Sequence, residues 1–125
     1  MQDQRRPLFA VLIDGDNLSS KYGTAIFDEI ASFGEASVRR IYGDFSGTGP
    51  QGWTTAVLAG LGIVPQHQPP NTTRKNASDL GLVIDAMDFL HSGRIDGFVL
   101  VSSDSDFTRL ASRIREQGLK IYGMG

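Results

Sequence analysis

Apolar residues in this chain fall into short unbroken runs that alternate with segments of helical spacing. The longest run, Leu8–Ile13, ends abruptly at the polar stretch Asp14-Gly15-Asp16-Asn17. Such a run, bounded by turn residues, is typical of a strand buried on both faces in the middle of a parallel sheet. The pattern returns at Phe98–Val101, which leads directly into Ser102–Asp106. The sequence therefore predicts two central strands, each followed by an Asp-x-Asp pair.

Further strands and helices are predicted around these two central strands. Phe107, Leu110, Ala111 and Ile114 follow the i, i+3, i+4, i+7 spacing of an amphipathic helix, and Gly118 closes it. The predicted helices are Ala25–Phe33, Trp53–Leu61, Ser78–His91 and Phe107–Gln117, and the predicted strands after the first are Ser37–Phe45, Ile63–Gln68, Gly97–Val101 and Leu119–Tyr122.

The alternation of strands and helices predicts an α/β fold, a three-layer α/β/α sandwich with a mostly parallel central sheet. The two most apolar strands, the first and the fourth, belong side by side in the middle, which gives the strand order 3-2-1-4-5. Ligands of such sheets bind beyond the carboxyl ends of the strands, where the strand order reverses. Asp14, Asp16, Asp104 and Asp106 are all expected at that place.

The predicted helix Ser78–His91 brings a further carboxylate to the sheet. At 100° per residue, Asp79 falls in the middle of the apolar side, whereas Asp85 and Asp88 fall at about 240° and 180° from it. We therefore expect Asp85 and Asp88 on a solvated face. The apolar arc around Asp79 contains Leu82, Val83, Ala86, Phe89 and Leu90, and is extended by Leu80, Ile84 and Met87.

Each of these acids also has a purely structural interpretation. Asp79 suits position N3 of a helix cap with Asn76, and Asp106 suits the same position with Ser103. Asp16 and Asn17 suit a turn. Asp14 is harder to explain in this way, because it ends a buried strand.

Taken together, however, the acids form a group that is unfavourable without a cation. Two carboxylates ~4 Å apart repel each other by ~1 kcal/mol in water and by ~4 kcal/mol at an effective dielectric constant near 20. A hard divalent cation removes this repulsion, and ligands that are all oxygen favour Mg²⁺ or Mn²⁺ over zinc.

Composition narrows the class of protein. With 125 residues, of which 40% are hydrophobic and 21% charged, we expect one soluble domain over residues 1–125. The absence of cysteine excludes thiolate catalysis and disulfides. No apolar run is long enough to cross a membrane, so a cytoplasmic location is expected. The net charge of −2 argues against a strong non-specific nucleic-acid binder, but leaves room for a nuclease with a small basic rim.

Three short motifs resemble those of the NYN family of PIN-like, LabA-like metal-dependent ribonucleases. They are IDGDN (Ile13–Asn17), KNASD (Lys75–Asp79) and SSDSDF (Ser102–Phe107). The resemblance implies hydrolysis of RNA with Mg²⁺ or Mn²⁺ as cofactor. It implies Asp14, Asp79, Asp104 and Asp106 as catalytic metal ligands, with Asp16, Asn17, Asp44 and Ser103 in support.

The implied partner is RNA, with single-stranded RNA expected and no membrane. Arg74 and Lys75 are expected to bind the substrate, and Lys21 and Arg109 are weaker candidates. Trp53 suits either base stacking or the core, with the core as the ordinary use. His67 and His91 are not needed as bases. The resemblance also leaves room for a homo-oligomer, and for a fused RNA-binding module after Gly125, in which case the chain is a fragment.

Two other functions stay open at this point. Haloacid-dehalogenase phosphatases also have Asp-x-Asp after the first strand, so that Asp14 would be the nucleophile and Asp16 the general acid. Against this, Leu18 stands where such enzymes usually have Thr or Ser, and Asp79 has no role. A non-catalytic RNA-binding domain is the second alternative, and the complete set of acids speaks against it.

Overall fold

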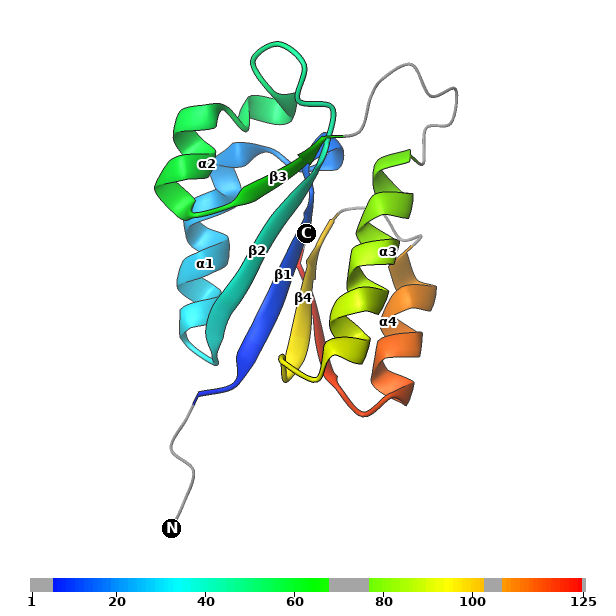
Figure 1. Cartoon of the computed structure of the whole chain (residues 1–125). Helices are drawn as coiled ribbons and strands as arrows, with labels where there is room; N and C mark the ends of the chain where they lie inside the picture. The colour runs from blue at the N-terminus through cyan, green and yellow to red at the C-terminus, as the bar shows by residue number, and fades with distance from the viewer. Residues whose placement is uncertain (1–5, 68–76, 103–106, 125) are drawn as a thin grey trace.

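The fold is a parallel five-stranded sheet between two layers of helices (Figure 1). The computed structural model describes residues 6–67, 77–102 and 107–124, with only the helical backbone described for residues 77–79. The sheet order is β3-β2-β1-β4-β5, and all four strand pairs are parallel. The predicted fold class and strand order are thus confirmed. The strands are β1 (Leu8–Asp14), β2 (Glu35–Gly43), β3 (Val64–His67), β4 (Gly97–Val101) and β5 (Lys120–Met124).

The helices divide between the two faces of the sheet, with α1 and α2 on one side and α3 and α4 on the other (Figure 1). Helix α2 is bounded by local signals: the Thr54 hydroxyl accepts a hydrogen bond from the Val57 amide, and Gly62 ends it with a φ of 66°. The helices are α1 (Gly23–Ala31), α2 (Thr55–Leu61), α3 (Ala77–Ser92) and α4 (Thr108–Glu116), and the 3₁₀ turns are η1 (Gly15–Asn17), η2 (Ser20–Tyr22) and η3 (Pro50–Gly52).

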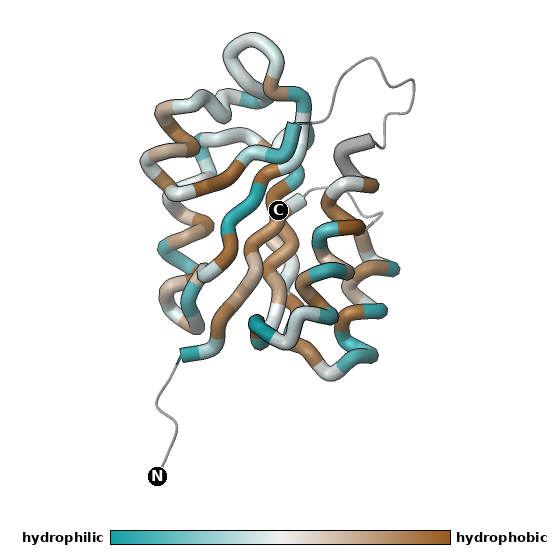
Figure 2. Tube along the Cα trace, viewed as in Figure 1, coloured by the Kyte–Doolittle hydropathy of each residue, from teal (hydrophilic) through white to brown (hydrophobic). Residues whose placement is uncertain are grey.

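Side chains of β1 alternate between two apolar cores. Phe9, Val11 and Ile13 belong to the core under α1 and α2, whereas Ala10 and Leu12 belong to the core under α3 and α4. The tube in Figure 2 shows the resulting apolar centre of the sheet, along β1 and β4. Because successive side chains of a strand point to opposite faces, Asp14, the last residue of β1, lies on the α3 side of the sheet together with Ala10 and Leu12.

Helix α3 packs on the sheet through a narrower stripe than its sequence predicts. Leu82, Ala86 and Leu90 are buried, but Leu80 and Ile84 are 62% and 53% exposed. The expectation that Leu80 and Ile84 extend the apolar arc was therefore wrong, because a narrow stripe of α3 packs on β1 and β2.

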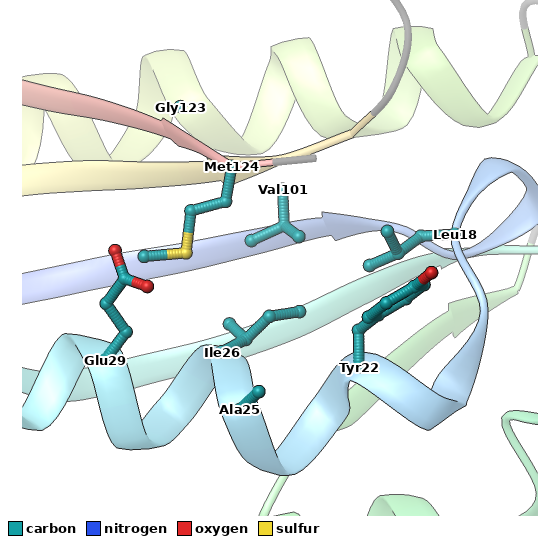
Figure 3. Close-up of a pocket in the computed structure, with 8 residues that line it drawn as sticks. All are labelled: Leu18, Tyr22, Ala25, Ile26, Glu29, Val101, Gly123 and Met124. Carbon is teal, nitrogen blue, oxygen red and sulfur yellow. The ribbon is translucent and has the colours of Figure 1, made fainter.

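The α1 side of the sheet is left partly open beside β5 (Figure 3). A hollow of about 470 Å³ lies there between α1 and the ends of β4 and β5. It is lined by Leu18, Tyr22, Ala25, Ile26, Glu29, Val101, Gly123 and Met124. None of the described helices has the length and apolar character needed to cross a lipid bilayer.

Candidate active site

Asp14 is the last residue of β1 and the single charged side chain that is buried in the described part of the chain, with 1% exposure. Its Oδ2 atom accepts a hydrogen bond from Asn17 Nδ2 at 2.8 Å and another from Ser102 Oγ at 2.9 Å. An ionised carboxylate is costly to bury unless hydrogen bonds or a cation stabilise it. These two donors therefore fix the carboxylate in one orientation and offset part of that cost.

The parallel register explains how residues 88 positions apart meet. Ile13 is aligned with Val101, so the residues that follow them, Asp14 and Ser102, leave the sheet side by side. The Ser102 amide donates to the Met124 carbonyl at 2.9 Å and so continues the ladder towards β5. Sequence reasoning named Ser103 and missed Ser102. The signal that could have found Ser102 is its position one residue after a strand paired with β1.

The side chain and the carbonyl of Asp16 both accept hydrogen bonds from neighbouring segments. Its Oδ1 atom accepts a hydrogen bond from the Asp44 amide at 3.2 Å, and its carbonyl accepts one from Gln51 Nε2 at 3.1 Å. A Cβ atom at Gly43 would lie 2.8 Å from the same Oδ1 atom, so a side chain at position 43 would displace this carboxylate. Asp16 thus fastens turn η1 to the end of β2, as the turn interpretation expected.

The Asp44 carboxylate is engaged within its own loop. Its Oδ1 atom accepts hydrogen bonds from the amide and the hydroxyl of Ser46, at 3.0 and 2.6 Å. These two bonds hold the pKa of the Asp44 carboxyl below its usual value. The next amide, that of Phe45, donates to His67 Nδ1 at 3.0 Å, which makes that ring nitrogen an acceptor. Asp44 therefore contacts the site through its backbone amide, which holds Asp16.

Asp85 faces the sheet, and the expectation that it lies on a solvated face was wrong. Its Oδ2 atom accepts a hydrogen bond from the Tyr42 hydroxyl at 2.7 Å and is 3.1 Å from Arg40 Nη1. Tyr42 is 1% exposed and is the register partner of Asp14 on β2. The helix arithmetic placed Asp85 on the polar side, but at 100° per residue it lies about 60° from the buried Leu82, at the edge of the stripe. At that edge β2 supplies both a hydroxyl and a guanidinium. Asp88 is exposed, as expected.

The other predicted site residues fall outside the described side chains. Asp79 lies in the first turn of α3, where only the backbone is described. Ser103, Asp104, Asp106, Arg74 and Lys75 lie outside the described residues altogether. Within residues whose side chains are described, no group of three His, Cys, Asp or Glu side chains that could hold a metal ion is present.

Comparison with known proteins identifies the family to which the chain belongs. The model of the NYN domain matches residues 8–125, nearly the whole chain. The chain belongs to the NYN domain family. NYN domains are PIN-like nucleases, so the family-level activity is that of a nuclease, and the resemblance carried by the three motifs is confirmed.

One solved structure shares the fold of this NYN domain. It is the crystal structure of a protein of unknown function from Vibrio parahaemolyticus RIMD 2210633, with a TM-score of 0.74 and 23% sequence identity. The match covers 98% of this chain and 85% of that one. At this identity the likeness supports the fold alone. No curated protein matches the sequence significantly.

Among the residues of the NYN domain considered for RNA contact, Trp53 has a structural role. Trp53 is completely buried, and its Nε1 atom donates to the Leu18 carbonyl at 2.8 Å, so base stacking was wrong and the core interpretation holds. Lys21 is exposed, with Nζ 5.2 Å from the centre of the Tyr22 ring. His91 lies in the last turn of α3. Arg109 is exposed on α4.

The donors around Asp14 fit a hard divalent cation. Asp14 offers a buried carboxylate at the point where the strand order reverses, between β1 and β4. Its two described partners contribute an amide and a hydroxyl, and the chain has no cysteine. Oxygen ligands without thiolates select Mg²⁺ or Mn²⁺. The side chains are thus chemically suited to the metal on which nucleases of this family generally depend.

Proposed function

We propose that this NYN domain is a ribonuclease that hydrolyses single-stranded RNA in the cytoplasm with Mg²⁺ or Mn²⁺. The observation that carries the proposal is the buried carboxylate of Asp14 at the reversal point of the sheet. A protein gains no stability from such a carboxylate at the end of its central strand. An acid that must bind a cation at a fixed place accounts for it.

Asp14, Asp79, Asp104 and Asp106 would hold the metal. When bound, the metal lowers the pKa of a water molecule and neutralises charge on the scissile phosphate. Asp104 follows Ser102 by two residues, and Ser102 contacts Asp14. The first turn of α3, where Asp79 stands, is the end of that helix that favours negative charge.

The remaining residues of the site would orient these acids. Asn17 and Ser102 converge on Asp14 Oδ2 and set the plane of its carboxylate. Asp16 holds turn η1 against the end of β2, so the segment that carries Asn17 is anchored at both ends. Arg74 and Lys75, which precede Asp79 in the sequence, would bind substrate phosphates.

The test is hydrolysis of a labelled single-stranded RNA in Mn²⁺, in Mg²⁺ and in EDTA. We expect cleavage with either metal and none in EDTA, and we expect Asp14→Asn, Asp79→Asn and Asp104→Asn to remove it. Asp88→Asn is the matched control, because this exposed carboxylate on α3 should leave cleavage unchanged. Full activity in all three acid variants would refute the assignment. RNA binding without hydrolysis by the wild type would favour the non-catalytic domain.

A further inference from the structure

The exposed side of α4 carries an excess of positive charge. Its nine residues include three arginines and one glutamate, in a chain whose net charge is −2. The three arginines and two hydroxyl residues of the helix, Thr108 and Ser112, are all exposed to solvent. We call this set the α4 surface: Thr108, Arg109, Ser112, Arg113 and Arg115.

Folding accounts for only part of this charge: the helix dipole favours Arg113 and Arg115 in the last turn, but not Arg109 in the first. Arg109 and Arg113 are one helical turn apart, and like charges at that spacing destabilise a helix by ~0.2–0.5 kcal/mol. Neither guanidinium makes a hydrogen bond or an ion pair within the part of the chain that the structure describes. By contrast, Arg39 and Arg40 on β2 both bond to neighbouring elements. The arginines of the α4 surface therefore face solvent with their donors available.

Two shallow hollows connect the α4 surface with the candidate active site. One, of about 440 Å³, is lined by Thr108, Arg109, Ser112, Arg113 and Glu116. The other, of about 290 Å³, lies between α4 and β5 and shares Thr108 and Ser112 with the first. This second hollow is also lined by Arg115 and by Ser102, whose hydroxyl donates to Asp14. A ligand extending from Asp14 past Ser102 would thus run directly onto the α4 surface.

We propose that the α4 surface binds the sugar–phosphate backbone of the RNA strand on one side of the cleavage site. This inference rests on the proposed function and adds a second contact region to it. Guanidinium groups bind phosphate oxygens with two parallel hydrogen bonds, and hydroxyl side chains bind phosphate and ribose. None of these groups reads a base, so the α4 surface supplies affinity and direction without sequence preference.

The experiment compares two double charge reversals of equal size. Arg109→Glu/Arg113→Glu alters the α4 surface. The control, Arg94→Glu/Lys120→Glu, alters exposed residues that precede β4 and begin β5, at the opposite ends of the strands. Binding of a fluorescein-labelled 12-nucleotide RNA is measured by anisotropy in EDTA, which stops cleavage, over a series of KCl concentrations.

We expect the α4 variant to bind the RNA at least tenfold more weakly. The slope of log affinity against log salt concentration should be less negative by about 1.4 than that of the wild type, the value expected for the loss of two phosphate contacts to a single strand. The control should stay within twofold of the wild type. In Mn²⁺, the control variant should hydrolyse bis(p-nitrophenyl) phosphate like the wild type.

Unchanged affinity in the α4 variant, an equal loss in both variants, or no RNA binding by the wild type would overturn the inference. Binding of a polyglutamate chain as tight as that of RNA would also overturn it, in favour of an acidic protein partner. Should the reversal variant not fold, Arg109→Gln/Arg113→Gln gives the same comparison with a smaller change of charge. Tight RNA binding without hydrolysis would refute the nuclease proposal while leaving this inference standing.

Discussion

Removing the Tyr42 hydroxyl tests how helix α3 is fixed to the sheet. In Tyr42→Phe the ring keeps its buried position, but Asp85 loses a hydrogen bond of 2.7 Å. A hydrogen bond to a charged group contributes ~1.5–3 kcal/mol. Asp85 keeps Arg40 at 3.1 Å and its side chain is 20% exposed, so water compensates in part. We expect the free energy of unfolding to fall by ~1.5 kcal/mol, and at ~4 °C per kcal/mol the melting temperature to fall by ~6 °C.

A double-mutant cycle isolates this bond from other effects. Urea unfolding of the wild type, Tyr42→Phe, Asp85→Ala and the double variant should give a coupling energy of ~1–2 kcal/mol between the two side chains. The contact of Asp85 with Arg40 is lost equally on both sides of the cycle and cancels. A coupling energy under ~0.5 kcal/mol would show that this hydrogen bond contributes little to fixing α3, and would refute the reasoning.

The same pair predicts how stability depends on alkaline pH. Burial, and then the hydrogen bond to Asp85, raise the pKa of the Tyr42 phenol far above its ordinary value of 10.0. The unfolded chain loses this proton near pH 10 while the folded chain keeps it, so the contribution of Tyr42 is complete below pH 10 and decreases above it. The loss should be ~1.4 kcal/mol per pH unit. The difference between wild type and Tyr42→Phe in urea midpoints from pH 9 to 11 measures it, and parallel curves would contradict it.

Three further predictions concern the end of the sheet that carries Asp14. Ser102→Ala should lower the free energy of unfolding, measured by urea titration, by ~2 kcal/mol, because the buried Asp14 carboxylate loses a hydrogen-bond donor. A decrease below ~0.5 kcal/mol would argue against the bond between Ser102 and Asp14. Millimolar Mn²⁺ should raise the melting temperature of the wild type, and EDTA should reverse this rise. The melting temperature of Asp14→Asn should not change with Mn²⁺, and an equal rise in both proteins would place the metal elsewhere. Ser46→Ala should raise the pKa of the Asp44 carboxyl, measured by NMR. Because the pKa of Asp44 is lowered in the folded state of the wild type, the variant should lose less stability than the wild type as the pH falls. If the substitution left the pKa of Asp44 unchanged, Ser46 would be excluded as the cause of the lowered pKa.

The sheet and its central strands were predictable because burial on both faces leaves a direct trace in the sequence. The runs Leu8–Ile13 and Phe98–Val101 were expected side by side because both are apolar on both faces, and the structure aligns Ile13 with Val101. The meeting of Asp14 with the residue after β4 follows from that alignment. The same argument, carried one residue further, would have identified Ser102.

Contacts between elements that are distant in sequence were not predictable from local spacing. The position of Asp85 on a helical wheel carries no information about Arg40 and Tyr42, which reach it from β2. Trp53 follows a glycine-rich loop, and only the folded chain places its indole against the Leu18 carbonyl. Local periodicity gives the face of a helix within about one residue, which is too coarse to decide the role of a side chain at its flank.

The hydrogen bond from Ser102 to Asp14 joins residues that are 88 positions apart in the chain. During synthesis the ribosome releases Asp14 long before Ser102 and the acids that follow it. A growing chain therefore contains no assembled acidic centre until β4 and the residues after it have been made. For the proposed nuclease, the order of translation delays cleavage of the RNA beside the ribosome until then.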